Sequence, residues 1–379
     1  MKKYKPMLIS AVYVCPVRGL AGLEPPEPVR LGQAARVAKG LGLERLMLPV
    51  LEESLLGTSR AKVGFLDGLI HALDQVDEAG LTGWLIAPAQ RVLGLDWAPP
   101  DLVRSVRDPE AGPVFVEGRI RNLWPFDWWA NTSLIQKRIK AFRELVAAVS
   151  GHSGLTGWLI LDRALEWSRP DLQAADLVLK SFMAEIRERD ESGSIYMGLG
   201  WSELLDPEMA RALTGQVDGV RISGCEKQPP GLDKGADLAG ELAMAAYLGT
   251  LARWLFGRPI EVEIGWAMVD KVGDTEEVME GFKRLAEQGL AGATWLSLID
   301  PEPTLYSQPP WILSPGLERI GLLDQGQEPK EQVETWIKEI RSGKPGDGIN
   351  DFLDISPQEY LDDPHTHLPR LWGHFRESS

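Results

Sequence analysis

The feature that most constrains the fold of this 379-residue chain is a regular alternation of short apolar runs with amphipathic segments. Such an alternation is typical of βα units around a parallel sheet. The runs that we expect to form strands are Met7–Val14, Leu46–Val50, Gly83–Ala87, Gly157–Leu161, Ile195–Leu199, Gly219–Ser223, Ile260–Ile264 and Ala293–Ile299. Eight strands make a (β/α)8 barrel, which commonly forms one domain in a chain of this length. The sequence therefore predicts an α/β fold, a (β/α)8 TIM barrel.

Helical periodicity fills the intervals between these runs, and glycines follow several of the expected helix ends, as helix termination favours. The expected helices are Pro28–Gly40, Arg60–Glu78, Leu134–Val149, Leu172–Arg189, Pro207–Leu213, Asp237–Phe256 and Glu276–Gln288. After Ile340 the composition turns to Gly, Pro and Asp. We therefore predict a barrel at residues 1–341 and a C-terminal extension at residues 342–379.

Charge and cysteine content limit the partners of the chain. The formal charge of −15 argues against nucleic acid, because phosphate backbones are bound by clustered Lys and Arg. Cys15 and Cys225 have neither metal-type spacing nor the density of a disulfide framework, so neither a zinc ribbon nor a disulfide scaffold is expected. The histidines fall in tail, helix or turn positions and no Gly-rich strand-to-helix loop is present, so we expect no metal and no cofactor. The apolar run Met7–Cys15 lacks a signal-cleavage motif after it, and no stretch approaches the ~20 apolar residues of a membrane span. We predict a cytoplasmic protein with no membrane partner.

Two long segments without periodicity follow the third and eighth expected strands, at Pro88–Asn131 and Asp300–Glu318. Loops after strands build the active-site face of a barrel, and indole faces suit the C–H faces of sugar rings. The Trp residues in these segments are Trp97, Trp124, Trp128, Trp129 and Trp311. We expect at least two of the last four to expose an indole face to a cleft; packing against barrel and helices is the alternative.

Carboxylates stand at the expected C-terminal ends of several strands, where a barrel places its chemistry. Glu263 ends the seventh run, Asp162 and Glu166 follow the fourth, and Glu203 follows the fifth. Glycosidic cleavage uses two carboxyl groups, one as proton donor and one as nucleophile or base. Glu263 is the candidate nucleophile, and Glu166 or Asp162 is the candidate acid/base. The alternatives are a rim ion pair between Asp162 and Arg163, and helix capping by Glu203.

A family resemblance appears at the same positions. The segment Gly257–Trp266 resembles the seventh-strand motif of the retaining glycosidases of clan A, in which a Lys/Arg-Pro pair leads to a nucleophilic Glu, an apolar residue and Gly. The segment Gly292–Asp300 looks like their eighth strand, whose Trp floors the sugar site, and Gly321–Lys330 looks like their closing motif. The resemblance implies a β-galactosidase-like or cellulase-like barrel with Glu263 as nucleophile and Trp295 under the sugar.

The chain also departs from this pattern. Asp162-Arg163 stands where the family has Asn-Glu, Met47 stands where it has a second-strand Arg, and the sixth strand lacks the expected His and Tyr. The candidate sugar contacts are Trp295, Trp201, Trp266, Trp128, Trp129, Glu203 and Arg163. Two functions remain open: a glycoside hydrolase acting on an oligosaccharide or glycan, and a catalytically inactive glycosidase-like barrel that binds carbohydrate.

Overall fold

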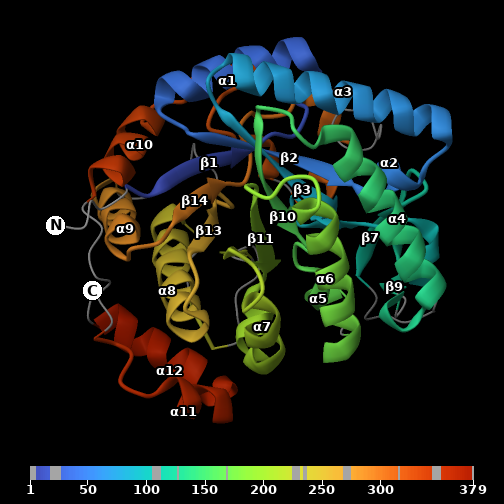
Figure 1. Ribbon diagram of the computed structural model, residues 1–379. Helices are drawn as coiled ribbons and strands as arrows, with labels where there is room; N and C mark the ends of the chain where they lie inside the picture. Colours follow the sequence, from blue (N-terminus) through green and yellow to red (C-terminus); the bar gives the residue numbers. More distant parts are fainter. Residues whose placement is uncertain are drawn as a thin grey trace.

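The computed structural model describes residues 6–17, 27–104, 112–125, 128–167, 170–223, 231–233, 237–267, 275–314, 316–343 and 351–377, without the side chains of residues 59, 125, 166 and 167. Eight parallel strands close a barrel in the order β1-β14-β13-β12-β11-β10-β3-β2, which confirms the predicted fold (Figure 1). They are β1 (Leu8–Val12), β2 (Arg45–Leu51), β3 (Thr82–Ala89), β10 (Leu155–Ile160), β11 (Ser194–Leu199), β12 (Gly219–Ile222), β13 (Ile260–Ile264) and β14 (Gly292–Trp295).

Helices surround the barrel. They are α1 (Pro28–Leu41), α3 (Ser59–Glu78), α4 (Thr132–Val149), α6 (Leu172–Arg187), α7 (Pro207–Thr214), α8 (Leu238–Phe256), α9 (Thr275–Glu287) and α10 (Val333–Ser342), with the short helices α2 (Glu52–Leu56) and α5 (Ala164–Trp167) at strand ends. The side chains of Thr58, Asn131, Asp171 and Asp237 cap α3, α4, α6 and α8 by accepting backbone N–H bonds. These caps satisfy donors that helix N-termini otherwise leave unpaired.

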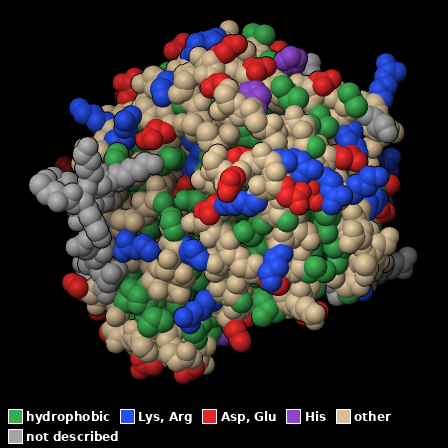
Figure 2. Space-filling view, viewed as in Figure 1, with side chains coloured by type: hydrophobic (Ala, Val, Ile, Leu, Met, Phe, Trp, Pro, Cys, Tyr) green, Lys and Arg blue, Asp and Glu red, His purple; other side chains and the backbone are tan. Residues whose placement is uncertain are grey.

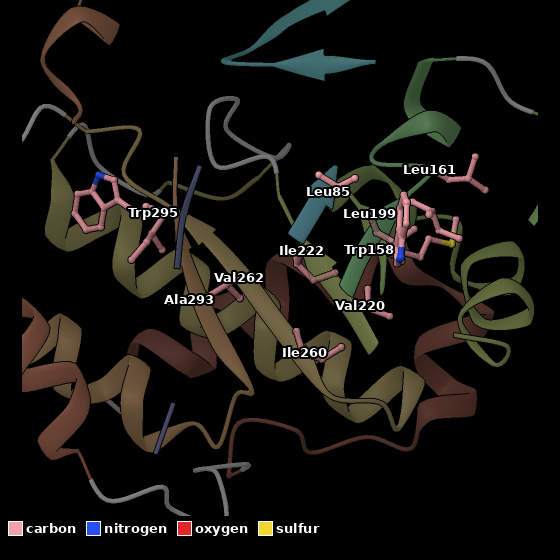
Figure 3. Packing of buried hydrophobic residues seen from close by; sticks show 14 of the residues in the cluster. Leu85, Trp158, Leu161, Leu199, Val220, Ile222, Ile260, Val262, Ala293 and Trp295 are labelled. Atoms are coloured by element: carbon pink, nitrogen blue, oxygen red, sulfur yellow. The ribbon is translucent and has the colours of Figure 1, made fainter. Parts of the chain in front are cut away.

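The two faces of each strand have different surroundings, as β13 illustrates. Ile260, Val262 and Ile264 pack into the layer between barrel and helices, and Figure 3 shows Ile260 and Val262 beside residues from neighbouring strands. Glu261 and Glu263 alternate with them and lie in the barrel interior, because strand side chains have a period of two. Burial of each large apolar side chain contributes roughly 1.5–3 kcal/mol. The apolar set fixes the strand register, and the register fixes both carboxylates inside the barrel.

The lower barrel interior holds a buried ion pair. Arg45 Nη2 lies 2.5 Å from Glu261 Oε2 and 3.3 Å from the Ser10 hydroxyl, and the Arg45 guanidinium stacks on the Trp84 ring at 3.9 Å. Arg45 and Glu261 are only 1% and 3% exposed. A buried charge needs such a partner, since removing one member of a buried pair typically costs about 3–5 kcal/mol.

The segment Pro88–Asn131, which we expected to lack regular structure, instead forms small sheets. One has four strands in the order β4-β5-β7-β8, and the other pairs two strands. Their bounds are β4 (Arg91–Val92), β5 (Leu95–Trp97), β7 (Pro113–Val116) and β8 (Arg119–Asn122), then β6 (Val103–Arg104) and β9 (Trp124–Pro125). Strands of two to four residues are too short to show periodicity in a sequence, which explains the error.

The C-terminal extension forms α11 (Pro357–Asp362) and α12 (Pro364–Glu377), which lie beside α8 in Figure 1. The hydroxyl of Tyr247 on α8 donates to the Leu368 carbonyl at 2.5 Å, and that of Tyr360 donates to the Leu204 carbonyl at 2.9 Å. No helix among the described residues is long and apolar enough to cross a membrane. Acidic and basic side chains are interspersed over the face shown in Figure 2.

Candidate active site

Two carboxylates and one guanidinium meet at the C-terminal end of the barrel. Arg221, on β12, places Nη2 at 2.7 Å from Asp162 Oδ2 and 3.4 Å from Glu263 Oε2. Because both oxygens lie near one nitrogen, they are at most about 6 Å apart, a limit that admits the ~5–5.5 Å separation of the carboxyls in retaining glycosidases. The structure thus brings together Glu263 and Asp162, two of the three predicted catalytic residues.

The backbone around Asp162 is specialised for this position. Its neighbours Leu161 and Arg163 have left-handed φ angles of 49° and 55°. A Cβ on Gly198 of β11 would lie 2.0 Å from Asp162 Oδ1, so only glycine leaves room for this carboxylate. Left-handed non-glycine residues cost of order 1–3 kcal/mol each and occur mostly where a site needs them. This strain singles out the end of β10 as a candidate functional position.

The charge of Arg221 is stable in this setting. Burial lowers the pKa of Arg221, whereas the carboxylates of Asp162 and Glu263 raise it, and the net pKa lies above the ordinary value. The guanidinium is 2% exposed, and its Nη1 is 3.7 Å from the sulfur of Met47. A permanent cation therefore stands between the two candidate catalytic carboxyls.

Trp266 forms one wall of the site. Its Nε1 donates to Glu263 Oε1 at 3.2 Å, and the indole is partly exposed. The buried Glu241 of α8 accepts backbone N–H bonds from Gly265, Trp266 and Ala267 at 2.5, 3.0 and 2.7 Å. Glu241 therefore fixes the turn after β13 and, through it, the direction of Trp266.

The β4–β5 hairpin covers the site. Leu93 and Gly94 form its turn with φ angles of 51° and 76°, and a Cβ on Gly94 would be 3.3 Å from the Trp266 ring. The cavity beneath the hairpin is about 20 Å³ and is lined by Val12, Ile86, Arg91, Val92, Leu93, Gly94, Asp162, Arg163, Arg221, Glu263, Trp266 and Leu296. Such a volume holds about one water molecule, whereas small-molecule sites usually measure ~300–1,000 Å³.

Most of the Trp side chains expected to line a cleft are buried instead. Trp128, Trp129 and Trp311 are 0%, 2% and 4% exposed. Trp128 stacks on Trp129 at 3.8 Å and lies under the guanidinium of Arg138 on α4. Trp124 is partly exposed. We correct the expectation for Trp128 and Trp129: the helical turn that carries them packs both rings into the main hydrophobic core beside α4, so neither ring faces a cleft.

Trp295 also departs from its expected role as the floor of a sugar site. It is 3% exposed, donates from Nε1 to the Ile320 carbonyl at 2.8 Å, and stacks with Trp336 in the layer outside the barrel. The strand period explains this: Thr294 faces inward, where it bonds Ser10 at 2.8 Å, so Trp295 faces outward. Leu296 lines the cavity instead.

The remaining candidates have mixed outcomes. Arg163 lines the cavity. Glu203 accepts from the Gly200 N–H at 2.8 Å and caps the turn after β11, the alternative that we considered for it. Trp201 is partly buried against the main core beside this turn. The side chain of Glu166 lies outside the described residues.

Sequence reasoning missed two residues of the candidate site, Arg221 and Glu241. In β12 the apolar residues on either side of Arg221 face the helices, so the period of two places the Arg221 side chain inside the barrel. A charged side chain in the barrel interior needs a charged partner, and this requirement could have been predicted from the sequence. Glu241 offers no such signal, because its contacts depend on how α8 packs against the turn after β13.

No family model matches the chain, and no curated protein matches its sequence. Solved structures do match its fold. A GH5_18 protein from Streptomyces cattleya in complex with GlcNAc is 16% identical over 90% of this chain and 82% of its own, with a TM-score of 0.68. A GH5_18 variant from Bifidobacterium longum subsp. longum in complex with Manβ1-4GlcNAc is 15% identical over 89% and 80%, with a TM-score of 0.67.

A third structure, the exo-β-1,4-mannosidase Op5Man5 from Opitutaceae bacterium strain TAV5, is 14% identical over 89% of this chain and 59% of its own. Its TM-score is 0.67. At such identities the similarity shows the fold. The chain shares its barrel architecture with these glycosidase structures.

Proposed function

We propose that this chain is a glycosidase-like barrel that binds a glycan at its C-terminal mouth without hydrolysing it. The observation that carries the proposal is the pairing of Arg221 with both Asp162 and Glu263. Hydrolysis of an unactivated glycoside requires a protonated carboxyl group beside the leaving oxygen. Both carboxylates of the described cavity face the Arg221 guanidinium, and Arg163 stands where the family has its acid/base Glu. This arrangement suits hydrogen-bond acceptors better than a proton donor.

Sugar hydroxyl groups are the donors that fit such acceptors. Asp162 Oδ1 is buried and has no hydrogen-bond partner among the described residues, and a buried acceptor of this kind is costly unless a ligand or water satisfies it. Trp266 adds an aromatic wall beside Glu263. The structural neighbours in complex with GlcNAc and Manβ1-4GlcNAc suggest the first ligands to test. A sugar ring needs more room than the cavity offers, so we expect binding to move residues that line it, among them those of the β4–β5 hairpin.

A second candidate function is retaining hydrolysis, with Glu263 as nucleophile and Asp162 as acid/base. The short distance between their carboxyl oxygens favours it. The replacement of the family Asn-Glu pair by Asp162-Arg163 disfavours it.

Turnover and binding measurements separate these functions. We expect no hydrolysis of aryl β-glycosides above the rate of Glu263→Gln, and we expect calorimetry to detect binding of Manβ1-4GlcNAc. Loss of the Glu263 charge should weaken binding at least about tenfold, because hydrogen bonds to charged groups contribute ~1.5–3 kcal/mol. The exposed Glu280→Gln on α9 is the matched control and should bind normally.

Each alternative has a distinct outcome. Wild-type turnover that falls by orders of magnitude in Glu263→Gln would establish the hydrolase. Absence of both turnover and binding across a glycan panel would reject the proposal.

A further inference from the structure

Three barrel elements converge on the guanidinium of Arg221. It contacts Asp162 after β10, Glu263 on β13 and Met47 on β2. All four side chains are at least nine-tenths buried. Two carboxylates this close together repel each other strongly in a buried site unless a cation lies between them.

We propose that Arg221 is the positioning residue of the site: its guanidinium holds Asp162 and Glu263 at a fixed separation, as a pair of hydrogen-bond acceptors facing the cavity. Arg221 acts through these carboxylates and need not touch the ligand. The inference deepens the proposed function, on which it rests for the identity of the ligand.

Met47 of β2 contacts Arg221 of β12, so an arginine on β2 could supply a guanidinium to the same part of the site. The sulfur of Met47 lies 3.7 Å from Arg221 Nη1. The Nη atoms of an arginine lie farther along the side chain than the sulfur of a methionine, so a guanidinium carried at position 47 could reach the place now filled by that of Arg221. If the site needs a cation at this place rather than an arginine on β12, exchanging the two residues should preserve it.

The exchange Arg221→Met with Met47→Arg therefore tests the proposal directly. Arg221→Met alone should lower the thermal midpoint of unfolding by roughly 5 °C or more, because it removes the guanidinium that contacts both buried carboxylates. The exchange variant should recover most of this loss. Met47→Arg alone should also be destabilising, since it places two guanidinium groups together.

A background experiment separates positioning from simple packing. In the variant Asp162→Asn/Glu263→Gln the carboxylates no longer repel, so adding Arg221→Met should lower the midpoint much less than it does in the wild type. An equal loss in both backgrounds would mean that Arg221 only fills space, and would overturn the proposal.

Ligand affinity supplies the functional measurement. Arg221→Met should weaken binding of Manβ1-4GlcNAc at least about tenfold, and the exchange variant should restore it. If the wild type binds no glycan, the proposed function fails, while the unfolding data still test Arg221 because they need no sugar. If Arg221→Met gives no folded protein, folding of the exchange variant supports the proposal and its failure to fold overturns it.

Discussion

At the scale of single residues, the site depends on positions where only glycine fits. Gly198 leaves space for Asp162, and Gly265 leaves space for Trp295. Gly265 has a φ of 99°, and a Cβ there would lie 2.6 Å from Trp295 Nε1. The same turn carries the backbone N–H groups that Glu241 accepts, so Trp266 keeps its place beside Glu263 only while this turn is intact.

Gly265→Ala should therefore be destabilising. A left-handed φ and a close contact in the core together cost about 2–5 kcal/mol, and Trp266 should move away from Glu263. Urea denaturation and tryptophan fluorescence measure the two effects. The control is Gly64→Ala in the middle of α3, where a Cβ meets nothing within 4 Å and should stabilise the helix by about 0.5–1 kcal/mol. Equal stability of both variants would contradict the prediction.

At the scale of elements, the barrel strands were predictable and the hairpins were not. The eight apolar runs are long enough to show their pattern, and every one became a barrel strand. The four-stranded sheet of the β3 insertion is built from strands of two to four residues, whose only sequence signals are the turn pairs Leu93-Gly94 and Glu117-Gly118. A turn of this kind needs φ > 0 at both central residues, for which Asn-Gly is the usual signal.

The β4–β5 hairpin can be loosened without breaking its turn. Leu93→Asn places Asn-Gly at the tip, which suits the left-handed backbone, but removes an apolar side chain that is 2% exposed above the cavity. We expect the hairpin to persist and the site to open more often, so that Manβ1-4GlcNAc associates several times faster in stopped-flow measurements.

Glu117→Asn is the matched control for this prediction. It makes the same turn sequence in the β7–β8 hairpin, where Glu117 and Gly118 have φ angles of 48° and 75° and neither residue lines the cavity. Its association rate should equal that of the wild type. An unchanged rate in Leu93→Asn would show that the hairpin tip does not limit access.

At the scale of the whole molecule, the fold and the chemistry were predictable to different degrees. Glu263 was found because a strand end and a local motif place it at the rim. Other residues of the site come from segments far away in the sequence. Arg221 contacts Glu263 itself, and Gly94 lies beside the Trp266 ring. A single sequence does not show which inward residues meet across a barrel. Trp295 shows the opposite failure, since one step along a strand reverses the direction of a side chain.

The C-terminal extension packs against the outer face of α8. That helix is buried on most of its surface, although a helix outside a barrel normally keeps a polar face towards water. The aromatic rings of Phe352, Trp372 and Phe375 pack around Tyr247, and Tyr360 packs against Trp254 on the same helix. Residues 351–377 thus cover an apolar surface that the barrel alone would expose.

A chain that ends at Gly343 tests whether the extension is a separate unit or part of the core. Because truncation exposes the outer face of α8, we expect a lower thermal midpoint and concentration-dependent self-association in light scattering, as large exposed apolar patches promote. Tyr360→Phe in the full chain is the mild control: it removes one hydrogen bond to Leu204 and should cost about 1 kcal/mol without self-association. A truncated chain that stays monomeric with an unchanged midpoint would show that residues 1–343 fold independently of the extension.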